Sequence, residues 1–394
     1  MKIIFCINQT VGSGGMEKVL QQRTNYLVEK FNYKILIVTT ERDSSFFKYK
    51  KSFYKFNPKI KIIDLNINYE DLWKKFSELS YFKRKIKNKK IRELNLKYLN
   101  KIIKDFKPDI LVSLGDADRH ICYKVLYPCK KVLEHHFNKQ IFTGELFFNG
   151  KRENITFFKK IKIIYRTYCE KILINKYDKF LVLTEEDKKD WGDNRVEVIP
   201  NPLTFYPEEF SKCENKKIIS VGRLFDQKGY DILIDVWNII SEKYPDWVLE
   251  IYGEGSEREN LQSKINKLGL EKSFLLKGAV KNIQDKYLES SIYVMSSRYE
   301  GFGMVLVEAM ACGLPVVSFD CPCGPKDIIK DKKDGFLVPF GNIELMAEKI
   351  EELIIDEEKR KLFGKNARKN IQRYSQDKIM NQWKELFEEL VRNK

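Results

Sequence analysis

The 394-residue sequence lacks several patterns that would assign it to common classes of protein. No apolar run reaches 18 residues, which argues against a membrane-spanning helix. The apolar run before Asn8 is too short for a signal peptide. Its eight cysteines form no CxxC pair, and its three histidines form no HExxH, so a disulfide scaffold and a zinc site are not expected. We therefore expect a cytoplasmic protein with reduced thiols.

Acidic residues are also scarce in one half of the chain. Residues 1–200 hold 42 Lys and Arg against 24 Asp and Glu, whereas residues 201–394 hold 30 against 32. The whole net charge of +16 therefore belongs to the first half. This asymmetry indicates that the first half meets an anionic surface, such as lipid headgroups, nucleic acid or a phosphorylated substrate.

Short apolar runs alternate with helical patterns in both halves, which predicts two α/β domains. Buried parallel strands are typically continuous runs of Ile, Leu and Val, covered by helices on both faces. In the first half such runs predict strands at Lys2–Ile7, Lys34–Thr39, Lys59–Asp64, Asp109–Leu114, Lys131–Glu134, Lys179–Leu183 and Val196–Ile199. In the second half they predict strands at Ile218–Val221, Trp247–Tyr252, Phe274–Leu276, Ile292–Met295 and Pro315–Ser318.

Pro200-Asn201-Pro202 interrupts this alternation and predicts a linker over about residues 200–216. We expect a first domain over residues 1–200 and a second over 201–374. The stretch at about 375–394 predicts an amphipathic helix that packs back on the first domain. Two doubly wound, Rossmann-like sheets facing across a cleft would bind ligand beyond the carboxyl ends of their strands.

The segment from Ser296 to Val317 carries the strongest chemical signal. An expected strand ends at Met295, and a loop with Gly301 and Gly303 leads into a helix. Glycines allow close ligand approach, and a helix N-terminus offers free N–H groups to phosphate. Glu300 and Glu308 can both face that ligand, and carboxylates accept hydrogen bonds from sugar hydroxyls. Together these features indicate a nucleotide sugar.

The spacing EGFGMVLVEAMACGLPVV resembles the signature of retaining family 4 glycosyltransferases of the bacterial surface-polysaccharide type, which have the GT-B fold. Further segments are similar to other blocks of that family. They are Gly12–Glu17, Ile199–Pro202, Val221–Leu224 with Lys228-Gly229, Ile251–Gly255, and Gly324–Asp327 followed by Asp334–Val338. The resemblance covers most of the chain and is weakest over residues 40–105.

The resemblance implies how each matching residue would bind the donor. Arg223 and Lys228 would neutralise the donor diphosphate, Glu300 would bind the transferred sugar, and Glu308 would bind the ribose. The remaining donor-binding positions would be Gly14, Gly15, Gly301, Phe302 and Gly303. An active-site histidine after a first-domain strand would be His135 or His136, and His136 is favoured.

Asp116-Ala117-Asp118 forms a DxD pattern, which can bind a divalent metal in another glycosyltransferase fold. The pattern is short, and it lies in the half without the nucleotide motifs, so we expect no metal. An acceptor-contacting loop, shared by Asp116 with His135, or a helix cap is the favoured interpretation. The Gly12–Gly15 loop also lacks the last glycine of GxGxxG, which disfavours a dehydrogenase.

Basic and aromatic residues mix at Lys83–Lys107, Phe147-Phe148 and Phe157–Lys162. This mixture indicates peripheral docking on the inner face of a cell membrane, with a solvated helix face as the simpler reading. The favoured function is metal-independent, retaining transfer of a hexose or N-acetylhexosamine. The donor would be a UDP-sugar, and the acceptor a membrane-linked oligosaccharide or glycolipid in surface-polysaccharide synthesis. A GT-B-fold sugar epimerase and a basic nucleic-acid-binding protein are the alternatives.

Overall fold

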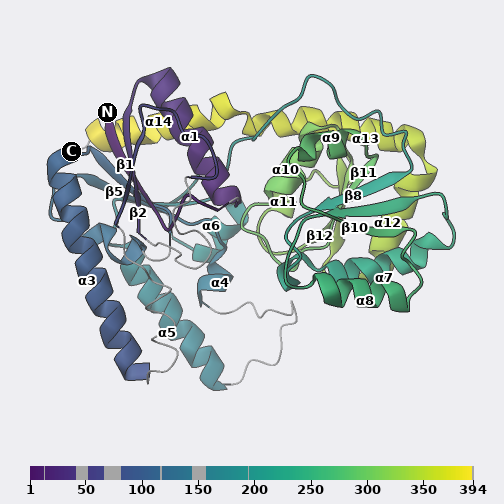
Figure 1. Cartoon of the computed structure of the whole chain (residues 1–394), viewed down its shortest axis with the longest axis horizontal. Coiled ribbons are helices and arrows are strands. Elements are labelled where there is room, and N and C mark those ends of the chain that lie inside the picture. The colour runs from purple at the N-terminus through teal and green to yellow at the C-terminus, as the bar shows by residue number, and fades with distance from the viewer. Residues whose placement is uncertain are drawn as a thin grey trace.

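A computed structural model of the chain describes residues 1–12, 14–40, 52–65, 81–115, 118–143, 157–193 and 195–392. Two lobes stand side by side, each built on a parallel sheet with helices on its faces (Figure 1). The two-domain α/β architecture expected from the sequence is therefore confirmed. Among the described helices, none is both long enough and apolar enough to cross a bilayer.

The first lobe contains a seven-stranded sheet in the order β3-β2-β1-β4-β5-β6-β7, with every neighbouring pair parallel. Its strands are β1 (Lys2–Ile7), β2 (Lys34–Thr39), β3 (Lys61–Asp64), β4 (Ile110–Ser113), β5 (Lys130–Glu134), β6 (Lys179–Val182) and β7 (Val196–Val198). Its helices are α1 (Gly15–Phe31), α3 (Tyr81–Phe106), α4 (Lys139–Thr143), α5 (Phe157–Ile174) and α6 (Glu185–Trp191), with 3-10 turns at Asp118–His120 and Cys122–Lys124.

The second lobe contains a six-stranded parallel sheet in the order β10-β9-β8-β11-β12-β13. Its strands are β8 (Lys217–Val221), β9 (Val248–Tyr252), β10 (Phe274–Gly278), β11 (Ile292–Met295), β12 (Val316–Asp320) and β13 (Gly335–Pro339). The helices are α7 (Tyr230–Ser241), α8 (Arg258–Lys267), α9 (Ile283–Leu288), α10 (Met304–Ala311), α11 (Pro325–Ile328), α12 (Ile343–Ile355) and α13 (Glu357–Ile371), with 3-10 turns at Asp226–Lys228 and Gln372–Tyr374. The last helix of the chain, α14 (Gln376–Arg392), follows them.

The expected strands are all present, and the structure adds β13 after β12. That strand holds only five residues and begins with Gly335, so its apolar run is too short to separate it from a loop by pattern alone. In both sheets the order reverses beside the first strand of the lobe, between β1 and β4 and between β8 and β11. Such switch points form crevices at the carboxyl ends of the strands.

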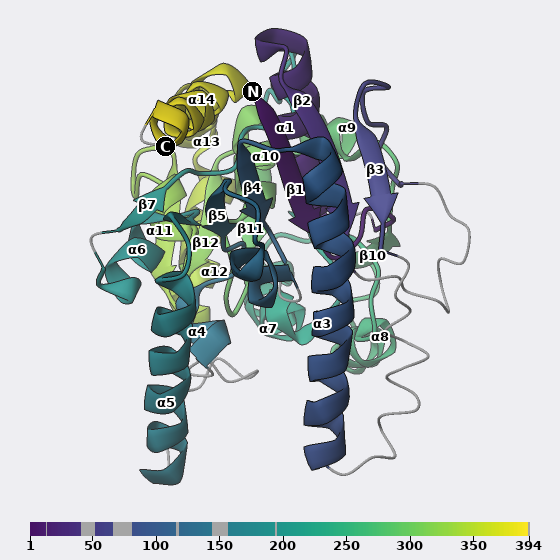
Figure 2. The same cartoon turned by 90° about the vertical axis from the view of Figure 1, so that its left-hand side faces the viewer.

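Helix α14 returns to the first lobe after the second is complete (Figures 1 and 2). Its buried Trp383 and Phe387 belong to the same apolar cluster as Ile3 of β1 and Leu27 of α1. The Tyr26 hydroxyl donates to Asp377 at 2.6 Å, which fixes the start of the helix beside α1. The chain therefore crosses between the lobes twice.

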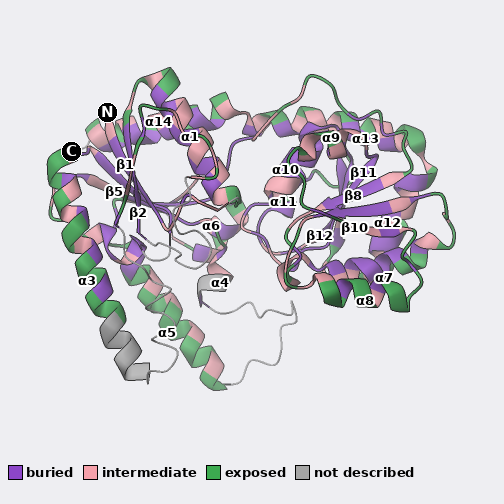
Figure 3. Ribbon diagram, in the orientation of Figure 1, coloured by how far each residue is buried: buried purple, intermediate pink, exposed green. Residues whose placement is uncertain are grey.

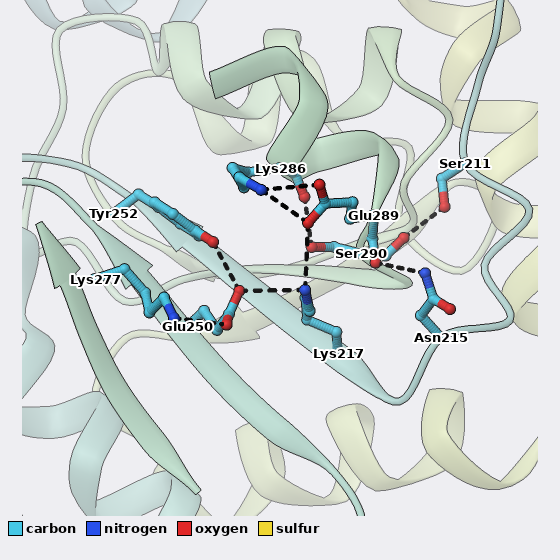
Figure 4. A network of polar contacts seen from close by, with 9 residues as sticks. All are labelled: Ser211, Asn215, Lys217, Glu250, Tyr252, Lys277, Lys286, Glu289 and Ser290. Carbon is cyan, nitrogen blue, oxygen red and sulfur yellow. Dashed lines mark hydrogen bonds and ion pairs between the residues drawn. The ribbon is translucent and has the colours of Figure 1, made fainter. Parts of the chain in front are cut away.

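A polar network stabilises the edge of the second lobe at β8, β9 and α9 (Figure 4). The nearly buried Glu250 accepts a hydrogen bond from the Tyr252 hydroxyl at 2.8 Å and lies 3.5 Å from the Nζ atoms of Lys217 and Lys277. Lys217 also reaches Glu289 at 3.4 Å. A buried carboxylate requires such partners, and here they connect the sheet to α9.

Candidate active site

The loop before α10 places Glu300 inside the second lobe at the carboxyl end of β11. Glu300 Oε1 accepts hydrogen bonds from Lys228 Nζ at 2.7 Å and from Ser297 Oγ at 2.6 Å. The side chain of Lys228 packs over Gly222, where a Cβ atom would lie 3.0 Å from Lys228 Cε. Glu300 and Lys228, 72 residues apart in the chain, therefore form one ion pair in one crevice.

The second glutamate, Glu308, lies in the second turn of α10 and is nearly buried. Its Oε1 accepts a hydrogen bond from Thr204 Oγ1 at 2.7 Å and from Lys18 Nζ at 3.0 Å. Lys18 belongs to α1 of the first lobe, so this ion pair spans the two lobes. The N-terminal halves of α1 and α10 thus face each other, and sequence reasoning missed both partners of Glu308.

The glycine loop before α1 folds around an internal carboxylate. A Cβ atom at Gly12 or Gly14 would lie 2.7 Å or 2.5 Å from an oxygen of Glu17. Burial raises the pKa of Glu17, and the charge of Arg223 from the other lobe opposes that shift. Gly14 caps α1, and a Cβ atom at Gly15 would meet no atom of the described residues within 4 Å, so these residues leave the start of the helix open at Gly15.

Arg223 follows β8 and is exposed, with its guanidinium 5.1 Å from the centre of the Phe225 ring. Tyr54 of the first lobe lies close enough to Glu17 and Glu308 for both charges to act on it; burial and these charges raise the pKa of Tyr54 to about 12. Cationic and anionic groups from both lobes therefore converge where α1 and α10 begin.

The loop after β5 places His136 against the second lobe. A Cβ atom at Gly301 would lie 1.9 Å from the His136 carbonyl oxygen, so only glycine permits this contact. Asn138 Nδ2 also donates to the Glu300 carbonyl at 3.3 Å. The two loops that carry the expected site residues therefore touch each other.

A buried ion pair lies behind His136. Glu134 Oε1 is 3.3 Å from His136 Nε2, and Glu134 accepts two hydrogen bonds from Arg23 at 2.5 and 2.7 Å. Burial alone would raise the pKa of Glu134, but the charge and hydrogen bonds of Arg23 outweigh it and hold that pKa below its usual value. Burial lowers the pKa of His136, which favours a neutral imidazole at neutral pH. The sequence shows Glu134 beside the histidines, but not its partner in α1.

His135 and His136 line one small cavity of about 40 Å³ at the carboxyl ends of β1, β4 and β5. The other residues that line it are Asn8, Met16, Leu114, Gly115, Glu134 and Phe137. The ring of His135 also packs edge-on against Phe180, with ring centres 4.8 Å apart, so it lies deeper in the lobe than His136. This cavity occupies the switch point of the first sheet.

The two aspartates of the DxD pattern differ in what the structure shows. Asp116 lies outside the described residues. Asp118 is buried and accepts hydrogen bonds from Ser113 Oγ at 3.0 Å and the Leu114 amide at 3.1 Å. Burial raises its pKa to about 7. Both donors precede Asp118 at the carboxyl end of β4, so its carboxylate ties the turn to that strand. No group of three or more His, Cys, Asp or Glu that could hold a metal ion occurs within the described residues.

The remaining expected donor residues shape the loop before α10. Gly303 caps α10 with φ near +96°, a left-handed conformation that favours glycine. Phe302 is buried edge-to-face against Tyr374, with ring centres 5.4 Å apart. Phe302 therefore anchors the loop to the second crossing of the chain, while Gly301 and the carbonyl oxygen of Glu300 contact the first lobe.

Known proteins resemble the chain in sequence and in fold. A family model described as glycosyl transferases group 1 matches residues 205–370. An uncharacterized glycosyltransferase of Haemophilus influenzae is 31% identical over 390 residues, which cover 97% of this chain and 99% of the relative.

A Campylobacter jejuni α-1,4-N-acetyl-D-galactosaminyltransferase, whose name gives a diphosphate-undecaprenol-linked saccharide as its acceptor, is 25% identical over 397 residues, with 99% of both chains covered. The Staphylococcus aureus protein TarM, solved with fondaparinux, α-GlcNAc-glycerol and UDP, has the same fold. Its TM-score is 0.75 at 21% identity, with 98% of this chain and 99% of that chain covered.

Proposed function

Since the chain belongs to the group 1, family 4-type glycosyltransferases with the GT-B fold, we propose that it transfers a hexose or N-acetylhexosamine from a UDP-sugar with retention of configuration. The acceptor would be a membrane-linked oligosaccharide or glycolipid of surface-polysaccharide synthesis. One observation carries the proposal: Glu300 and Glu308, each held by a lysine, lie around the N-terminus of α10 where the two lobes meet.

The donor would lie across this meeting point. Glu308 offers carboxylate oxygens to ribose hydroxyls, and Glu300 offers them to the transferred sugar. The diphosphate would lie near Arg223, Lys228 and the start of α1 beyond Gly15. Cations there stabilise the negative charge that grows on the leaving diphosphate. The solved TarM complex with UDP supports the choice of nucleotide.

Catalysis would proceed by attack from the face that the diphosphate leaves. The acceptor oxygen forms a bond to the anomeric carbon while the bond from that carbon to the phosphate oxygen breaks. The acceptor proton passes to that same phosphate oxygen, so no protein carboxylate acts as a nucleophile. Arg223 and Lys228 would supply the positive charge without a metal ion. His136, neutral beside Glu134, would orient the sugar by hydrogen bonding.

The acceptor would approach from the first lobe, whose excess of positive charge suits an anionic membrane. The Campylobacter relative, with its lipid-linked acceptor, supports this choice of acceptor class. The protein would then act at the inner face of the cell membrane, with its donor in the cytoplasm.

A donor screen with excess EDTA tests the proposal. Purified protein is mixed with UDP-, GDP- and ADP-sugars, and thermal shift and nucleotide release are measured. One UDP-sugar should raise Tm and be slowly hydrolysed despite EDTA. Analysis of the anomer formed with a soluble acceptor analogue would test retention. Loss of all turnover in EDTA would contradict metal independence, and inversion would contradict the mechanism.

Three variants then separate the roles. Glu308→Ala should raise the Kd for UDP about tenfold or more, because a charged hydrogen-bond acceptor is lost. Lys228→Met should lower kcat by about 10²-fold or more, because leaving-group charge grows in the transition state. Lys243→Met, an exposed lysine paired with Glu351 on α12, should change neither constant. Wild-type kcat in Lys228→Met would contradict the assigned diphosphate contact.

A further inference from the structure

The outward face of α5 carries an unusual concentration of exposed apolar side chains. Seven of the twenty large apolar side chains exposed among the described residues lie on this one helix. Phe158 is 82% exposed and Phe157 73% exposed. We call these seven residues the α5 stripe: Phe157, Phe158, Ile161, Ile164, Tyr165, Tyr168 and Ile172.

The α5 stripe lies on one side of the helix, because its members recur at intervals of three and four residues. At 100° per residue they fall within an arc of roughly 120°. The opposite side contacts the lobe, where Leu173 and Ile174 are buried and Ile163 and Thr167 are half-buried. The stripe is therefore on the side of α5 away from the lobe. Figure 3 shows most of α5 in the colour of exposed residues. A contiguous exposed apolar surface of this kind marks an interaction site.

The charged residues around the stripe indicate which kind of partner it binds. Lys160, Lys162, Arg166 and Lys171 are exposed on the same helix. The single acidic residue of α5, Glu170, is already held by Arg119 through two hydrogen bonds of 2.6 and 3.2 Å. Basic side chains flanking aromatic and aliphatic ones match the headgroup region of an anionic bilayer.

Helix α3 adds positive charge on the same side of the molecule. Figure 2 shows α3 and α5 extending in the same direction, away from α14. Among the described side chains of α3, Lys89, Lys90, Lys97 and Lys101 are exposed, and so are Leu94 and Tyr98. Two helices would therefore meet a flat anionic surface together. Phe147-Phe148, also expected to join such a surface, lies outside the described residues.

We propose that the α5 stripe inserts at the headgroup level of an anionic bilayer, while the lysines beside it bind lipid phosphates. The inference deepens the proposed function by naming the contact with the membrane that holds the acceptor. Lipid binding itself needs no donor, so it can be tested without relying on that function.

Cys169 supplies a reporter beside the stripe. It is exposed on α5, whereas the other seven cysteines, all within the described residues, are buried. The full chain is labelled at this thiol with a polarity-sensitive maleimide dye and titrated with vesicles. Phosphatidylcholine vesicles containing 30% phosphatidylglycerol should shift the emission to the blue. Pure phosphatidylcholine should not, and 0.5 M salt should weaken the shift.

Matched variants assign the contact. Phe158→Ser with Ile164→Ser should weaken vesicle binding at least about tenfold, since two apolar side chains leave the interface. Lys160→Gln with Lys162→Gln should weaken it by about fivefold per lysine. The control, Ile355→Ser with Leu362→Ser, removes side chains that are 68% and 55% exposed on α12 and α13 of the second lobe. It should bind within twofold of the wild type.

The outcomes separate this proposal from the others. No blue shift, or an equal shift with neutral vesicles, would overturn it. So would a wild-type dimer that the α5 variants dissociate, because the stripe would then be an interface between copies. Oligonucleotide binding lost in the same variants would favour nucleic acid instead. Donor hydrolysis without vesicles should be unchanged in every variant; its absence in the wild type would count against the enzymatic function alone.

Discussion

Removing the charge of Glu134 should destabilise the first lobe by several kcal/mol. The carboxylate and the Arg23 guanidinium are 1% and 0% exposed, and two hydrogen bonds join them. The guanidinium also lies 4.0 Å from the ring centre of Trp383 on α14. The pair thus connects β5, α1 and α14, elements that are far apart in the sequence.

Glu134→Gln keeps the shape of the side chain and leaves the arginine charge buried without a counter-charge. Removing one partner of a buried ion pair typically costs about 3–5 kcal/mol. Because the glutamine amide oxygen still accepts one hydrogen bond, we expect the lower end, about 3 kcal/mol. In a domain of this size that lowers Tm by about 6–12 °C.

Thermal unfolding followed by circular dichroism and tryptophan fluorescence measures this loss. Two controls are needed. Arg23→Met combined with Glu134→Leu replaces the pair by apolar groups and should lie within about 2 kcal/mol of wild type or above it. Asp246→Asn breaks an exposed ion pair with Lys216 and should change stability by less than about 1 kcal/mol. A Tm for Glu134→Gln within 1 °C of wild type would refute the reasoning.

Three further predictions concern the contact between the lobes and the response to acid. Gly301→Ala would place a Cβ atom 1.9 Å from the His136 carbonyl oxygen and so push the two lobes apart. Turnover should fall at least about tenfold, and X-ray scattering should show a larger radius of gyration. Unchanged scattering would contradict the contact. Lys18→Met removes the ammonium 3.0 Å from Glu308 and should weaken UDP binding about fivefold in calorimetry, because the carboxylate that would bind the ribose loses the cation that holds it. Equal affinity would show that this ion pair does not contribute to the donor site. Burial lowers the pKa of His120 to about 3, so its protonation opposes folding as the pH falls from about 6.5 to 3. In urea titrations, His120→Gln should therefore remove about 1.4 kcal/mol of destabilisation per pH unit below pH 6. The same loss of unfolding free energy with falling pH in the variant and the wild type would contradict this.

Much of the fold could be predicted from the sequence, because a buried parallel strand is recognisable from a few consecutive apolar residues, such as Lys2–Ile7. The same holds for the loop before α10, where Glu300 and Gly303 lie within a few residues of each other. Strand β13 was missed because five residues beginning with glycine carry too little pattern.

The cross-lobe contacts could not be predicted, because local pattern says nothing about pairing between distant residues. Lys18 and Glu308 are 290 residues apart, and Arg23 and Glu134 are 111 apart. In the sequence, a charged helical residue that the fold will bury beside a partner looks the same as one that stays exposed to solvent. The close approach of Gly301 to His136 is likewise a property of the assembled lobes.

The return of α14 to the first lobe has a consequence for how the protein is made. The apolar cluster around Ile3 and Leu27 includes Trp383 and Phe387, so it cannot close when the last strand of its own sheet, β7, has been synthesised. About 190 more residues must follow, on the order of 10–40 s at usual elongation rates. During that interval the surface that α14 will cover is open on the ribosome, while the whole second lobe can fold in advance. The lobe that is translated first thus completes its folding last. A stop codon just before α14 would destabilise the first lobe, although the truncation removes residues from the other end of the chain.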